Sequence, residues 1–96
     1  MKAIPLRRVK KGDREKRVLM GLIDLYLKTG RAVGSNTLRE SGFEELSSAT
    51  IRNYFAILEE AGYLEQQHTS GGRVPTPLSL QLYADSLLLL AKVNGF

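Results

Sequence analysis

Apolar residues recur at helical spacing in four stretches of the 96-residue chain, and short polar or glycine-rich segments separate these stretches. Spacings of three and four residues place side chains on one face of a helix, so each stretch predicts a helix with one buried face. The first helix is expected to begin at an Asp13 cap and to end at Gly30. Its predicted core positions are Val18, Leu19, Leu22, Ile23 and Tyr26.

Small polar residues and glycines also bound the second and third helices. Ser35 is predicted to cap a brief helix that runs to Glu40. Ser47 or Ser48 is predicted to cap the next helix, which Gly62 ends. In that third helix the predicted buried stripe consists of Ile51, Phe55 and Leu58.

The C-terminal third of the chain predicts a hairpin and one more helix. Residues 63–67 and 73–74 are typical of two short strands joined across a glycine-containing loop, and residues 31–34 form an extended link that could add a strand. The last helix is expected to start at Thr76–Pro77, because a proline at the first helical position loses no hydrogen bond, and to continue nearly to Gly95. It carries Leu80, Tyr83, Leu87 and Leu90.

Together these elements predict a mainly α fold with a small β-hairpin, a winged helix-turn-helix with a three-helix core, a wing and an extra C-terminal helix. We expect a basic arm at residues 1–12 and the folded domain at residues 13–85. Residues 86–96 are either an extension of the last helix or the start of a regulatory and dimerisation region.

The positive charge is concentrated at the N-terminus. The chain has a net charge of +4, but residues 1–17 hold eight basic and two acidic residues, which gives +6 there and −2 in the remainder. Such an arm is typical of a segment that settles on a polyanion, and a solvated tail is the alternative. The arm residues expected on a DNA backbone are Arg7, Arg8, Lys10 and Lys11.

Composition excludes several classes of site. With no cysteine, and His68 as the single histidine, the chain offers no disulfide, no thiolate metal site and little basis for a catalytic triad, so we expect no enzyme activity, metal or cofactor. Neither the basic N-terminus nor the apolar residues 86–91 resemble an export or membrane signal, which favours a cytoplasmic protein.

The outward face of the third helix carries residues suited to reading DNA bases. Ala49 and Ala56 keep its surface low, so the helix can enter a major groove and a methyl group can contact thymine. Arg52 can bind guanine and Asn53 adenine, each with two hydrogen bonds. Glu60, with its neighbour Glu59, lies near the opposite end, which should point away from DNA. The alternative is an ordinary surface helix.

Four ordered motifs resemble one family of bacterial repressors. They are Val33–Leu38, Leu46–Asn53, Leu58–Leu64 and His68–Thr76, and at this spacing they are similar to the N-terminal DNA-binding domain of the HrcA heat-inducible transcription repressors. The resemblance covers roughly residues 14–85. It implies a winged-helix repressor that binds, as a dimer, an inverted-repeat operator (the CIRCE element) ahead of chaperone operons, helped by the GroE chaperonin.

Carried over residue by residue, the resemblance places the start of the recognition helix at Ser47–Asn53 and the wing at His68–Arg73. Phosphate contacts are expected from hydroxyl, amide and N–H groups, and backbone contacts from the wing. The phosphate-binding set is Ser35, Asn36, Thr37, Ser47, Ser48 and Thr50, and the wing set is His68, Thr69, Ser70, Gly71, Gly72 and Arg73.

Two features depart from the family. After Thr76 the family usually continues with Gly-Tyr-Arg, whereas residues 78–81 here are Leu-Ser-Leu-Gln, so no contact made by that arginine is carried over. Family members also continue beyond the position of Phe96 into a long regulatory and dimerisation region.

The elements, the outward face of the third helix and the four motifs together predict a DNA-binding repressor. A winged-helix protein-interaction module and a binder of structured RNA are the alternatives.

Overall fold

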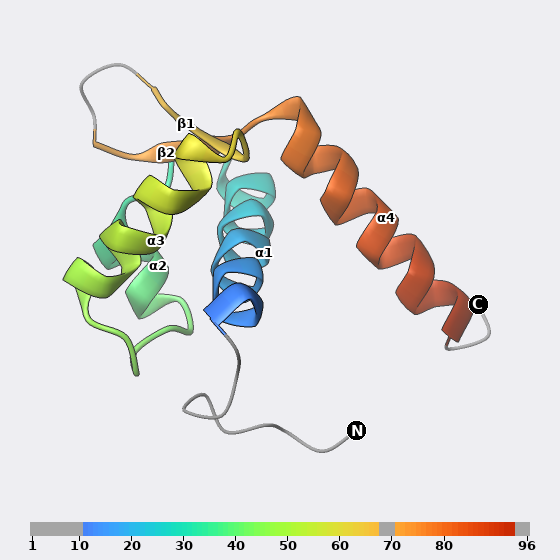
Figure 1. Ribbon diagram of the computed structural model, residues 1–96, viewed down its shortest axis with the longest axis horizontal. Helices are drawn as coiled ribbons and strands as arrows, with labels where there is room; N and C mark the ends of the chain where they lie inside the picture. Colours follow the sequence, from blue (N-terminus) through green and yellow to red (C-terminus); the bar gives the residue numbers. More distant parts are fainter. Residues whose placement is uncertain (1–10, 68–70, 94–96) are drawn as a thin grey trace.

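The computed structural model of the chain describes residues 11–67 and 71–93 (Figure 1). It contains four helices and a two-stranded antiparallel sheet in these residues, which confirms the predicted mainly helical fold with a small hairpin. Their bounds are α1 Lys11–Thr29, α2 Ser35–Glu40, α3 Ser48–Glu60, β1 Leu64–Gln66, β2 Arg73–Pro75 and α4 Pro77–Val93.

Helix α1 begins two residues earlier than predicted. Lys11 is already helical, and Asp13 lies within the first turn instead of capping it. An acid in the first turn still stabilises a helix through the helix dipole, so the signal at Asp13 was displaced by less than one turn. At the other end, Gly30 has a φ of 71° and donates its N–H to the Tyr26 carbonyl at 2.7 Å. The predicted stop is confirmed.

The predicted cap of α2 was wrong by one position. Gly34 is the N-cap, with extended backbone angles of −86° and 164°, and no side chain caps the helix. The Gly34 carbonyl accepts the N–H of Leu38 at 3.0 Å, so Ser35 is the first helical residue and its hydroxyl lies too late to cap.

Helix α3 is capped as predicted. Ser47 Oγ accepts the N–H of Thr50 at 3.1 Å, and Gly62, with a φ of 89°, follows the helix end. Tyr54 joins the expected buried stripe and is 8% exposed. The buried face of α3 is therefore Ile51, Tyr54, Phe55 and Leu58.

The hairpin pairs with the link between α1 and α2. Leu64 lies opposite Pro75 and Gln66 opposite Arg73, a slightly different span from the predicted strands 63–67 and 73–74. On its other side Arg73 pairs with Val33, because each residue's N–H donates to the other's carbonyl at 2.9 Å. The extended link thus contributes one bridge to the sheet.

The core lies between α1, α3 and the sheet. Helix α1 has α2 and α3 on one side and α4 on the other (Figure 1). The fully or nearly fully buried hydrophobic residues of α1 are Val18, Leu19, Leu22 and Ile23, and Val33, Leu38 and Leu64 join them from the other elements.

Helix α4 packs on this core through residues of its N-terminal half. Its Leu80 and Tyr83 lie partly buried against the core, but Leu87 and Leu88 are 50% and 60% exposed. Leu87 continues the helical spacing of Leu80 and Tyr83, but it is exposed because α4 diverges from α1 toward its C-terminal end (Figure 1). No helix in residues 11–67 and 71–93 is long and apolar enough to cross a membrane.

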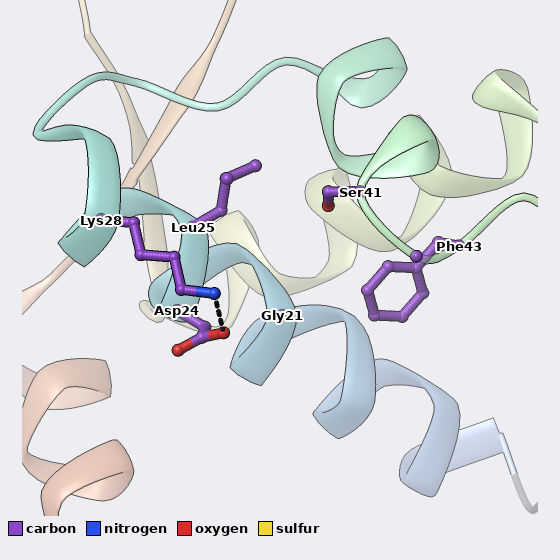
Figure 2. A pocket seen from close by; sticks show the side chains of 7 residues that line it. Gly21, Asp24, Leu25, Lys28, Ser41 and Phe43 are labelled. Carbon is purple, nitrogen blue, oxygen red and sulfur yellow. Dashed lines mark ion pairs between the residues drawn. The ribbon is translucent and has the colours of Figure 1, made fainter.

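A shallow hollow of about 230 Å³ lies between α1 and the turn after α2 (Figure 2). The ring of Phe43 covers Gly21 so closely that a Cβ atom there would lie 2.5 Å from the ring. On the same helix Asp24 forms an ion pair with Lys28 at 3.5 Å and accepts the hydroxyl of Tyr83 at 3.1 Å. These contacts fix α1 against the α2–α3 turn and against α4.

Candidate nucleic-acid interface

The outward face of α3 is exposed as the helical periodicity predicts. Ala49, Arg52, Asn53 and Ala56 are all exposed, whereas the buried stripe faces α1 and the sheet. Neither Arg52 nor Asn53 has a hydrogen-bonding or ion-pair partner among the described residues. A guanidinium and an amide without partners, flanked by two alanines, leave room for base edges to approach.

The start of α3 has one side-chain hydrogen bond within its own first turn and a second one to the start of α2. Ser47 Oγ donates to Thr50 Oγ1 at 2.9 Å, and Ser48 Oγ donates to Asn36 Oδ1. The hydroxyl protons of Ser47 and Ser48 are therefore used inside the protein. The Thr50 hydroxyl proton and the Asn36 amide group remain available as donors toward solvent.

Arg39 is a positioning residue that sequence reasoning missed. Its Nε donates to the Leu46 carbonyl at 2.8 Å and its Nη2 to the Glu44 carbonyl at 3.3 Å. These bonds brace the turn that leads into α3, so Arg39 orients the helix that carries Arg52. An arginine at the end of a short helix is a weak signal for such a role.

Arg73, predicted to contact a DNA backbone, lies folded against the end of α3. Its Nε donates to Glu59 Oε1 at 2.8 Å and its Nη1 to the Gly71 carbonyl at 2.9 Å, and its side chain is 18% exposed. Glu60 is exposed and points away from this pair, because adjacent residues of a helix diverge.

The wing is only partly described. Gly71 has a φ of 79°, which favours glycine, and Gly72 is buried against Ala32. His68, Thr69 and Ser70, predicted to form the wing tip, lie outside the described residues. So do Arg7, Arg8 and Lys10 of the basic arm, whereas Lys11 begins α1.

One further surface lies along α3. Thr50, Asn53, Tyr54, Ala56 and Ile57 line an open hollow of about 480 Å³. Ile57 is 36% exposed and was not among the predicted contacts. The exposed surface of α3 is thus wider and more apolar than the positions chosen from sequence.

Comparison with known proteins supports the resemblance carried by the four motifs. No family model matches the chain. The heat-inducible transcription repressor HrcA of Protochlamydia amoebophila (strain UWE25) is 64% identical to it over 88 residues, which cover 92% of this chain and 23% of that protein. The HrcA of Chlamydia pneumoniae is 59% identical over 68 residues, 71% of this chain and 17% of that protein. This chain belongs to the HrcA family. It spans about a fifth of the length of these HrcA repressors.

Solved structures agree with the fold. A crystal structure of a hypothetical protein at 2.2 Å resolution matches with a TM-score of 0.80 and 40% identity, over 86% of this chain and 26% of that one. The activation domain of the phage T4 transcription factor MotA matches with a TM-score of 0.69 over 92% of this chain and 82% of that one. The sequence identity to this second structure is 16%, so the similarity concerns the fold alone.

Proposed function

We propose that this chain is the sequence-specific DNA-binding domain of a transcriptional repressor of heat-shock chaperone operons, and that it catalyses no reaction. The observation that carries the proposal is the pair Arg52 and Asn53, exposed between Ala49 and Ala56 on α3 and without partners among the described residues. The identity of 64% to an HrcA repressor supports it.

The contacts divide by chemistry. Arg52 and Asn53 read base edges from the major groove, and Ala49 and Ala56 allow the close approach. Phosphates are bound by the first turns of α2 and α3, through the hydroxyls of Ser35, Thr37 and Thr50 and the Asn36 amide. Ser47 caps the second of these turns, and Ser48 joins the two. The residues of the arm and of the wing tip add attraction to the flanking backbone.

The operator is an inverted repeat of the CIRCE type, bound by two copies of the chain. A two-fold repeat presents the same half-site twice, so it requires two recognition helices related by a two-fold axis. In the full-length repressor the GroE chaperonin is a further partner. Both statements concern the whole repressor, of which this chain represents a fraction.

A protein-interaction role without DNA is the second candidate, because Leu87 and Leu88 of α4 are exposed and apolar. The same fold in a transcription factor's activation domain means that fold alone does not decide between them.

Selection of bound sequences from a random duplex pool, followed by competition with duplex RNA and with an acidic protein, tests the proposal. We expect an enriched inverted repeat that neither competitor displaces at equal concentration. Equal competition by RNA would favour an RNA binder. The absence of any enriched sequence would overturn the proposal.

A further inference from the structure

Arg73 is held by the protein through both its backbone and its side chain. Its backbone exchanges two hydrogen bonds of 2.9 Å with Val33, and Gln66 lies opposite it across the hairpin. Its guanidinium donates to Glu59 at 2.8 Å and to the Gly71 carbonyl at 2.9 Å. With a side chain 18% exposed, Arg73 presents little of its charge to solvent.

Glu59 is an unfavourable residue for its position unless it is paired. It lies in the last turn of α3, where the partial negative charge of the helix end repels an acid. The positive charge of the Arg73 guanidinium offsets the negative charge of the Glu59 carboxylate and the partial negative charge of the helix end. The ion pair therefore joins the recognition helix to the base of the wing and compensates the negative charge at this end of α3.

The hairpin cannot easily shift along the body of the protein. A Cβ atom on Gly72 would lie 2.9 Å from Ala32 Cβ, so the chain just before β2 lies directly against the link between α1 and α2. The backbone fixes where the wing starts, and the ion pair fixes its direction relative to α3.

We propose that Arg73 is a positioning residue for DNA binding, which sets the angle between wing and recognition helix through Glu59 and makes no phosphate contact of its own. The proposal rests on the function proposed above.

The test compares Glu59→Gln with Glu60→Gln on the inverted-repeat duplex that the parent chain selects. Both variants remove one acid from the same end of α3, so they share any general gain in attraction to DNA, but Glu60 is exposed and has no partner among the described residues. We expect Glu59→Gln to bind about tenfold more weakly than Glu60→Gln. Equal or tighter binding by Glu59→Gln would overturn the proposal, because a released Arg73 would then be free to contact phosphate.

Arg73→Gln completes a double-mutant cycle with Glu59→Gln. We expect the double variant to bind no more weakly than Arg73→Gln alone, with a slope of log affinity against log salt equal to that of the parent. A slope reduced by about 0.9 in Arg73→Gln would instead show that Arg73 neutralises a phosphate in the parent, and it would overturn the proposal.

The charge-swapped pair Arg73→Glu with Glu59→Arg keeps the net charge of the parent. We expect it to recover most of the affinity that Arg73→Glu loses alone, and a swap that binds as poorly as Arg73→Glu would contradict the inference. Amide hydrogen exchange at Val33 and Arg73 without DNA gives an independent result. Faster exchange in Glu59→Gln than in Glu60→Gln supports the positioning role of Arg73. If no duplex were selected, the proposed function would be wrong, but this exchange result would still stand.

Discussion

Three arginines near α3 have different surroundings. Arg39 bonds two carbonyls of the turn before the helix, Arg73 binds Glu59 at its end, and Arg52 has no partner among the described residues. Truncating a hydrogen-bonded arginine inside a fold lowers stability, whereas truncating an exposed one does not. Substitutions of the three arginines should therefore have different effects on stability and on DNA binding when both are measured.

Replacing Arg52 or Asn53 with alanine should weaken operator binding by about 1–3 kcal/mol each, with little change in affinity for random duplex, because base contacts add discrimination and phosphate contacts do not. Gel-shift titrations with operator and scrambled duplexes measure both. Arg52→Lys is the matched control, since it keeps the charge and loses the two-pronged geometry. If Arg52→Ala weakened binding to both duplexes equally, Arg52 would not be a base reader.

For single residues, the sequence predicted which side chains are exposed better than it predicted their hydrogen-bonding partners. The outward face of α3 followed from periodicity because the rotation per residue is fixed within a helix. The pairing of Arg73 with Glu59 did not, because it depends on how the hairpin lies against α3. Similarly, the cap at Ser47 was predicted because capping is local, but the bond from Ser48 to Asn36 was not, because it depends on how α2 packs beside α3.

At the scale of elements, the ends of α1, α2 and α3 were predicted to within two residues because caps and glycine stops act locally. The errors lie where elements meet. Leu87 has the same helical spacing as the partly buried Leu80 and Tyr83, but the direction of α4 relative to α1 leaves it half exposed. One contact between these two helices is the hydrogen bond from Tyr83 of α4 to Asp24 of α1.

The Tyr83–Asp24 bond predicts a dependence of stability on alkaline pH. Partial burial raises the pKa of the Tyr83 hydroxyl above its ordinary value of about 10, and the hydrogen bond to Asp24 and its charge act in the same direction. Because the folded pKa is the higher one, this stabilisation is fully present below the unfolded pKa and is lost as the pH rises through the folded value.

Tyr83→Phe should therefore cost about 1 kcal/mol of unfolding free energy at neutral pH, and the difference from the parent should shrink above pH about 10. Urea unfolding across a pH series measures this difference in unfolding free energy. The other tyrosines are present in both proteins, so their titration does not contribute to it. A difference that stays constant through the alkaline range would contradict this role for Tyr83.

At the scale of the whole molecule, charge and apolar surface are unevenly distributed. Basic residues gather before and within the start of α1, and exposed leucines gather toward the end of α4. Helix α1 separates α4 from α2 and α3 (Figure 1). A deletion of the arm and a substitution in α4 test these two features separately.

Removal of residues 1–10 eliminates Lys2, Arg7, Arg8 and Lys10. It should flatten the plot of log affinity against log salt by about 0.9 for each phosphate that the arm neutralises in the parent, while the melting temperature stays unchanged because the core begins at Val18. Affinity titrations at several salt concentrations give the slope. An unaltered slope would show that the arm is a solvated tail.

Leu88→Glu should abolish weak self-association if the exposed end of α4 is an interface. Leu78 is 56% exposed near the other end of the same helix, so Leu78→Glu is the matched control and should behave as the parent does. Sedimentation across a concentration series compares the three. Monomeric behaviour of the parent at every concentration would remove the case for a dimer formed through α4.

The bridge between Val33 and Arg73 also has a consequence for the order of folding. The two residues are far apart in the chain, so the bridge closes a long loop and forms only after the hairpin has met the α1–α2 link. Helix α2 begins two residues after Val33. Its N-terminal end is therefore anchored only once the segment around Arg73, which is synthesised much later, is in place. A chain released before residue 73 should leave α2 dynamic, and the wing should open in the same cooperative unit as the helices beneath it.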